Sequence, residues 1–100
     1  MKKIKQKILI TGCAGFIGFH LCKSLLDTNK FLVIGIDNLN NYYDTKLKKD
    51  RLDILNRNKK SFYFHKFDIT NFKKLNNIFK NNRFDAVVNL AAQAGVRYSI

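Results

Sequence analysis

The chain has 100 residues, of which 46% are apolar and 13% aromatic, and its formal net charge is +12. This length allows one small domain with a single core over residues 1–100, and the apolar content excludes a disordered chain. No apolar run approaches the roughly 18 residues of a membrane span, and no signal peptide opens the chain, so we expect a cytoplasmic protein without a membrane partner.

Two buried-type strands and a helix between them open the chain. Residues 4–11 end in the uninterrupted apolar run "ILI", which is typical of a strand buried on both faces of a parallel sheet. Residues 16–27 predict a helix whose apolar stripe consists of Ile17, Leu21 and Leu25, with Cys22 and Leu26 beside it. Residues 31–37, "FLVIGID", predict a second buried strand, which ends in the carboxylate of Asp37.

The remaining residues continue the alternation of helix and strand. Asp44 can cap a helix that extends to Asn56 and carries on one face Leu47, Ile54 and Leu55. The aromatic run at residues 61–67 predicts a strand, and "DAVVNLAA" at residues 85–92 predicts another. Between them Thr70 can cap a short helix with three-four spacing of its apolar residues, Phe72, Leu75, Ile78 and Phe79.

This order of elements predicts the fold class. Strands that alternate with helices of this length imply parallel pairing and right-handed crossovers. We therefore expect an α/β fold with a Rossmann-like doubly wound parallel sheet, of which these four strands form the amino-terminal half. A complete fold of this type continues with further strands, so the sequence is interpreted as the amino-terminal portion of a larger protein.

A cluster of glycines follows the first strand: Gly12, Gly15 and Gly18. In a glycine-rich turn of this kind, one glycine makes the sharp turn, one lets a pyrophosphate approach, and one lets helix and strand pack closely. The free N–H groups at the helix start, at Phe16 and Ile17, would face the phosphates. The spacing is GxxGxxG, which is a weak signal alone, and the alternative of a merely structural tight turn stays open.

Asp37 lies nineteen residues after Gly18, at the end of the second predicted strand. A carboxylate in this place can accept hydrogen bonds from the hydroxyls of an adenosine ribose, and its charge would repel a 2′-phosphate. The sequence therefore predicts NAD as the cofactor in preference to NADP.

Four stretches carry a family resemblance: "TGCAGFIGFHL", "GIDNLNNYYDTKLKKDRL", "FDIT" and "NLAAQAGVRYS". They resemble the extended short-chain dehydrogenase/reductase family of nucleotide-sugar epimerases and dehydratases, and most closely its UDP-glucuronate 4-epimerase branch. The resemblance covers the chain from Ile8 onward. Beyond the glycine turn and Asp37, it implies cofactor contacts at the ribose from Asn38 and Asn40, at adenine from Asp68 and Ile69, and after the fourth strand from Leu90, Ala91, Ala92 and Gln93.

The resemblance also implies a place for Arg97 on the nucleotide-sugar side of the cleft. Several of these residues have a structural alternative, which stays open. Asp68 can cap the following helix, Asn38 and Asn40 can be turn formers, and Arg97 can be an exposed residue at a helix start.

The family mechanism moves a hydride from sugar C4 to NAD and returns it to the other face of a 4-keto intermediate. Its base is a tyrosine made acidic by a lysine four residues later. Tyr42 and Lys46 have this spacing, but they lie in the early ribose-side loop, so we interpret the match as accidental. No catalytic residue is predicted in the chain, which we expect to be inactive alone and to meet a UDP-sugar only with a carboxy-terminal part.

Other classes of function remain as alternatives. The chain can be a non-catalytic dinucleotide-binding or interaction module that pairs with another chain or with itself. The 19 basic residues also suggest a nucleic-acid binder, but they are spread along the sequence, which favours solvated helix faces and no nucleic-acid partner. No metal site is predicted, because Cys13 and Cys22 form no CxxC pair and the histidines complete no zinc-like spacing.

Overall fold

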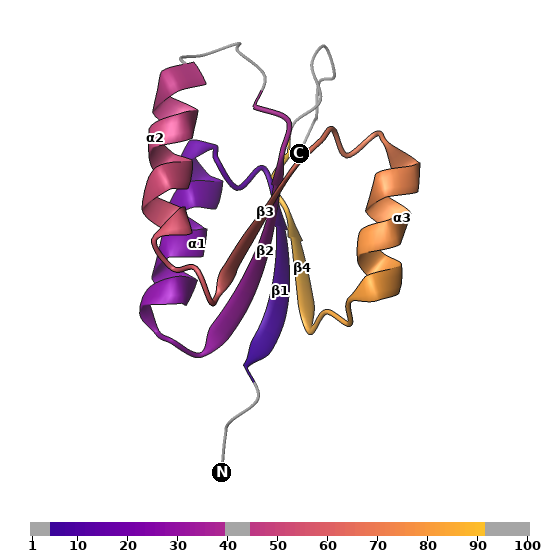
Figure 1. Ribbon diagram of the computed structural model, residues 1–100, viewed down its shortest axis with the longest axis horizontal. Helices are drawn as coiled ribbons and strands as arrows, with labels where there is room; N and C mark the ends of the chain where they lie inside the picture. Colours follow the sequence, from indigo (N-terminus) through magenta and orange to yellow (C-terminus); the bar gives the residue numbers. More distant parts are fainter. Residues whose placement is uncertain (1–4, 40–44, 92–100) are drawn as a thin grey trace, which may run out of the picture.

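The computed structural model describes residues 5–39 and 45–91, which form four strands and three helices. The strands are β1 (Gln6–Thr11), β2 (Phe31–Asp37), β3 (Phe62–Lys66) and β4 (Ala86–Asn89), and the helices are α1 (Phe16–Asp27), α2 (Thr45–Asn56) and α3 (Phe72–Asn81). All strand pairs are parallel, in the order β3-β2-β1-β4. Helices α1 and α2 lie on one face of the sheet and α3 on the other (Figure 1), which confirms the predicted α/β fold class.

The carboxyl ends of the strands meet at one edge of the sheet. Thr11, the last residue of β1, pairs with Ile36 in β2 and with Asn89 in β4. Asp37, the last residue of β2, pairs with Lys66 at the end of β3. Because parallel strands run in the same direction, the turn after β1 and the segments after β2 and β4 leave the sheet side by side.

The core has two layers, one on each face of the central strands. Successive residues of a strand point to opposite faces, so Ile8 and Ile10 pack on the side of α1 and α2, whereas Leu9 packs on the side of α3. The layer against α3 also contains Ile34 and Ile78. Both central strands are thus covered on both faces, as their uninterrupted apolar runs predict.

The buried stripe of α1 differs from the predicted one. Phe19, Cys22 and Leu26 are buried, and the predicted Leu21 and Leu25 are half-buried and pack against this core, whereas Ile17 is 67% exposed. Both stripes have helical spacing, so periodicity alone cannot choose between them. The choice is made by the sheet, because α1 begins directly after the tight turn and that turn fixes which side of the helix faces β1 and β2.

The other two helices also bury fewer of the predicted residues. In α2 the core residues are Leu52 and Leu55, and Leu47 is 46% exposed. In α3 only Ile78 is buried, and Phe72 is 71% exposed. Among the described residues, the buried core layer on the side of α3 is the smaller of the two, and part of the three-four pattern of α3 stays in solvent.

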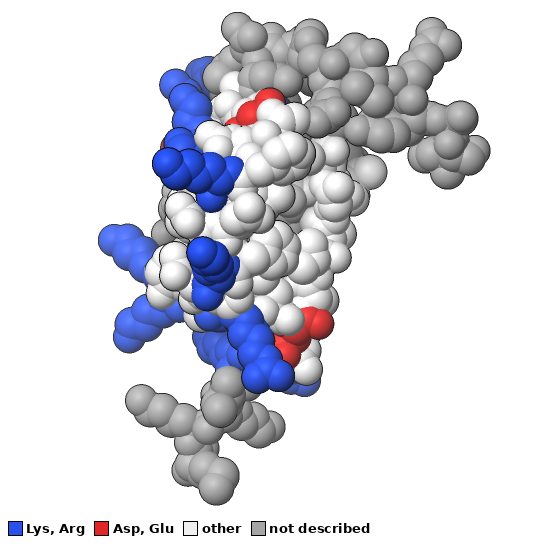
Figure 2. All heavy atoms as spheres, turned by 90° about the vertical axis from the view of Figure 1, so that its right-hand side faces the viewer, with Lys and Arg blue, Asp and Glu red and all other residues white. Residues whose placement is uncertain are grey.

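Figure 2 shows the face of the molecule on which α3 lies. Lysine and arginine side chains stand along one side and at the lower end of this face, and its middle is uncharged. Exposed apolar side chains occur on α3 and β4, among them Phe79 and Val87. None of the helices in the described ranges is long and apolar enough to cross a membrane.

Candidate functional site

The turn after β1 is built around Gly12. Its φ of +73° lies in the left-handed region that glycine adopts without steric cost, and its N–H donates to the carbonyl oxygen of Ile36 at 2.7 Å. A Cβ at this position would also lie 2.8 Å from the backbone of both Leu90 and Ala91. Gly12 is therefore required twice, once for the sharp turn and once for the close approach of the segment that follows β4.

Gly18 lets α1 pack tightly against the turn. A Cβ there would lie 2.1 Å from the carbonyl oxygen of Gly12 and 3.1 Å from the Cα of Cys13. These are backbone atoms, which cannot move aside as the end of a flexible side chain can. The glycine is thus explained by the packing of the protein itself.

Gly15 has no comparable explanation within the described chain. Its φ of −71° suits any residue, and a Cβ would come only to 3.3 Å from the carbonyl oxygen of Gly12. Gly15 is also the N-cap of α1, and no side chain caps the first turn. The first helical bond runs from the N–H of Phe19 to the carbonyl of Gly15 at 2.8 Å, so the preceding N–H groups, at Phe16 and Ile17, are available to an anion.

Helix α2 places a cation beside this turn. An Nη atom of Arg51 donates to the carbonyl oxygen of Ala14 at 3.0 Å, and the guanidinium carbon lies 5.9 Å from the ring centre of Phe16. The Phe16 side chain is 66% exposed, so the arginine lies over a ring at the molecular surface. Arg51 is not among the predicted site residues, although its place in the stretch "GIDNLNNYYDTKLKKDRL" is a signal that could have found it.

The carboxylate of Asp37 lies against the same turn and is only 5% exposed. Its Oδ2 accepts from the backbone N–H of Ala14 at 3.0 Å. Its Oδ1 accepts from the backbone N–H of Leu39 at 2.7 Å and from the ammonium of Lys48 at 3.4 Å. The predicted ribose carboxylate is therefore held against the glycine turn from the end of β2. Lys48, like Arg51, is not among the predicted site residues.

Asn38 and Asp68 meet where the chain leaves β2 and β3. The amide of Asn38 donates to Asp68 Oδ2 at 3.3 Å, while Asp68 Oδ1 accepts from the backbone N–H and the hydroxyl of Thr70 at 2.9 and 2.8 Å. The bond from the Thr70 N–H, with those from its hydroxyl and from Asn38, lowers the pKa of the exposed Asp68. The predicted cap at Thr70 is wrong: α3 is capped by Asn71, which accepts from the N–H of Lys74.

The segment after β4 is fixed to β1 by the hydroxyl of Thr11. This hydroxyl accepts from the N–H groups of Leu90 and Ala91 at 3.1 and 3.3 Å and donates to the side chain of Asn89. Leu90 and Ala91 are thereby held beside Gly12. Ile69, by contrast, packs partly against the core layer on the side of α3. The other predicted residues lie outside the described ones: Asn40, Ala92, Gln93 and Arg97.

The two cysteines lie near the site but are not reactive groups. Both are buried and free, and burial raises the pKa of the Cys22 thiol to about 12 and that of Cys13 further still. Both are therefore neutral thiols at physiological pH. Residues 5–39 and 45–91 contain no group of three histidine, cysteine or acidic side chains arranged to hold a metal ion.

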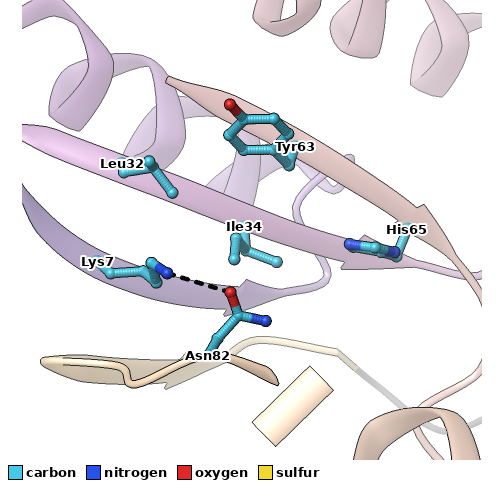
Figure 3. Close-up of a pocket in the computed structure, with 6 residues that line it drawn as sticks. All are labelled: Lys7, Leu32, Ile34, Tyr63, His65 and Asn82. Atoms are coloured by element: carbon cyan, nitrogen blue, oxygen red, sulfur yellow. Dashed lines mark hydrogen bonds between the residues drawn. The ribbon is translucent and has the colours of Figure 1, made fainter. Parts of the chain in front are cut away.

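A hollow of about 360 Å³ lies elsewhere, on the sheet face that carries α3. The side chains of Leu32, Ile34, Tyr63 and His65 line it from β2 and β3 (Figure 3). Lys7 closes one side, where its ammonium donates to the side-chain oxygen of Asn82 at 3.2 Å. None of the predicted site residues within the described ranges lines this hollow, which is thus distinct from the glycine turn.

The arrangement can be compared with known proteins. The chain is 51% identical over 95 residues to protein CapI of Staphylococcus aureus, and 48% identical over 92 residues to a UDP-glucuronate 4-epimerase of Thermodesulfobacterium geofontis. The structure of UDP-glucuronic acid 4-epimerase from Bacillus cereus in complex with UDP-glucuronic acid and NAD is similar, with a TM-score of 0.78 and 40% identity over 92% of this chain.

The chain spans 28% of the length of each of these three proteins, while they cover 95%, 92% and 92% of it. These likenesses confirm the resemblance to nucleotide-sugar epimerases and dehydratases that the sequence motifs indicate. The family model described as GDP-mannose 4,6 dehydratase matches residues 9–100. The chain belongs to this family.

Proposed function

We propose that the chain is the NAD-binding amino-terminal segment of a nucleotide-sugar epimerase of the UDP-glucuronate 4-epimerase type. The observation that carries the proposal is the uncapped start of α1 next to a buried carboxylate. Gly15 leaves the first N–H groups of the helix free, and Asp37 is held at the adjacent strand end by the N–H of Ala14 at 3.0 Å.

These residues fit a dinucleotide. The N–H groups of Phe16 and Ile17 would bind the pyrophosphate, and the absence of a side chain at Gly15 leaves room for it. The described part of the chain leaves one acceptor site of Asp37 for a ribose hydroxyl. Asn38 and Asp68 meet at the ends of the neighbouring strands, where the resemblance places adenine.

When bound, NAD would accept and return the hydride of the sugar C4. The residues described here would only bind and orient the dinucleotide. A proton at the sugar hydroxyl must be moved by a base, and such transfers typically contribute 10²–10⁴-fold to a rate. We therefore expect the hundred residues to bind NAD and to leave UDP-glucuronate unchanged.

Titration calorimetry with NAD and NADP tests the proposal, with Asp37→Asn as the variant and Asp50→Asn, an exposed carboxylate on α2, as its matched control. We expect NAD to bind more tightly than NADP, and Asp37→Asn to weaken NAD about tenfold or more because a charge-assisted hydrogen bond contributes about 1.5–3 kcal/mol. Asp50→Asn should leave the affinity unchanged.

Two results would contradict the proposal. One is a folded wild-type chain that binds no NAD at millimolar concentration. The other is conversion of UDP-glucuronate to UDP-galacturonate, measured by chromatography, by the hundred residues with NAD above a no-protein control. That second result would assign a catalytic role to Tyr42 and Lys46 if Tyr42→Phe abolished it.

A further inference from the structure

Lys48 changes the net charge that Asp37, the proposed ribose carboxylate, presents to a ligand. The side chains of Lys48 and Asp37 are 16% and 4% exposed, so this ion pair is largely removed from solvent. Buried partners of opposite charge interact strongly, because water screens them little. Asp37 therefore meets a ligand as one half of a neutral pair and not as a bare negative charge.

The hydrogen bonds to the carboxylate lead to a second consequence. An ionised carboxylate has about four acceptor sites. The N–H of Leu39 and the ammonium of Lys48 occupy Oδ1, and the N–H of Ala14 occupies one site of Oδ2. The described residues leave one site on Oδ2, so Asp37 can accept from one ribose hydroxyl while Lys48 holds the other oxygen.

We propose that Lys48 is a specificity-determining residue, which sets how strongly this site discriminates between NAD and NADP through its ion pair with Asp37. The inference rests on the proposed function. A 2′-phosphate placed next to Asp37 would be repelled by its carboxylate. The same phosphate would be attracted by the ammonium of Lys48, which lies 3.4 Å from Asp37 Oδ1. The ion pair thus limits the repulsion that Asp37 alone would exert, and Lys48 also keeps the carboxylate aligned with the N–H of Ala14.

Loss of the Lys48 charge should change the discrimination between the two dinucleotides, whereas general damage to the site would weaken both alike. Removal of the ammonium by Lys48→Met leaves an uncompensated carboxylate, so NADP should weaken more than NAD. We expect the ratio of the NADP to the NAD dissociation constant to rise about tenfold or more. A merely structural role of Lys48 would weaken both dinucleotides by the same factor.

The experiment measures both dissociation constants for the wild type, Lys48→Met, Lys48→Arg and Lys49→Met. Lys49 is an exposed neighbour on the same helix, so Lys49→Met is the matched control and should keep the wild-type ratio. Lys48→Arg retains the positive charge and should also keep the wild-type ratio of the two dissociation constants. If Lys48→Met does not fold, Lys48→Gln removes the same charge with a polar side chain.

Hydrogen exchange of the Ala14 amide in the ligand-free protein is the second readout. We expect faster exchange in Lys48→Met than in Lys49→Met, because Asp37 loses the partner that fixes it. An unchanged dissociation-constant ratio overturns the inference, as does a wild type that binds NAD but no detectable NADP. A wild type that binds neither dinucleotide overturns the proposed function and the specificity role, and the amide exchange then decides separately whether Lys48 positions Asp37.

Discussion

A methyl group at Gly18 should damage the fold far more than one at Gly15. In Gly18→Ala the new Cβ would lie 2.1 Å from the carbonyl oxygen of Gly12, whereas ordinary contact begins near 3.4 Å. The backbone must therefore shift, and overpacking of this kind costs typically 1–3 kcal/mol or more. Alanine also gains roughly 0.5–1 kcal/mol over glycine inside a helix. Because the clash is with backbone atoms, the cost lies in the upper part of its range, and the net loss should be about 2 kcal/mol.

In Gly15→Ala the corresponding distance is 3.3 Å, which requires a relaxation of only a few tenths of an ångström. The φ of −71° is already suitable for alanine. The remaining cost is the poorer N-cap, which is worth up to about 1 kcal/mol. Gly15→Ala should thus be the milder change in stability, although it crowds the proposed pyrophosphate position.

Thermal unfolding of the three proteins, followed by circular dichroism, compares these effects. A domain of 60–100 residues loses about 4–8 °C in Tm for each kcal/mol, so Gly18→Ala should lower Tm by about 8–16 °C and Gly15→Ala by less than about 8 °C. NAD titration of the folded variants should show the reverse order of damage, with Gly15→Ala the weaker binder. A Tm of Gly18→Ala equal to or above the wild-type value would refute the packing argument.

Two further predictions concern the strand ends and the buried thiols. Thr11→Val should lower the free energy of unfolding in urea by about 1 kcal/mol, because the Ala91 N–H loses its acceptor while the Leu90 N–H keeps the carbonyl oxygen of Thr11 at 3.1 Å; an unchanged midpoint would contradict this role of the hydroxyl. Burial raises the pKa of Cys22 from 9.0 to about 12, so its neutral form is favoured by folding, and the resulting stability is complete below pH 9 and lost as the pH rises towards 12. In Cys22→Ala the fall in stability over this range should be shallower than in the wild type, and equal slopes would show that the thiol does not contribute.

The alternation of strand and helix was determined by the sequence itself. The bounds of α1 and β2 agree with the predicted residues 16–27 and 31–37, because a tight turn and a charged strand end mark them locally. The turn at Gly12 could also be predicted, since only glycine adopts its φ without cost. These features depend on residues that lie close together along the chain.

The residues that contact the strand end and the glycine turn were decided by the tertiary structure. Spacing placed Asp37 at the end of a strand, but the ammonium of Lys48, eleven residues later, reaches it only because α2 packs beside α1 on the same face. The same packing brings Arg51 to Ala14. The buried stripe of α1 was likewise open to two interpretations, because helical periodicity does not say which side meets the sheet. Contacts across 11 to 37 residues follow from how elements dock, and no local pattern encodes them.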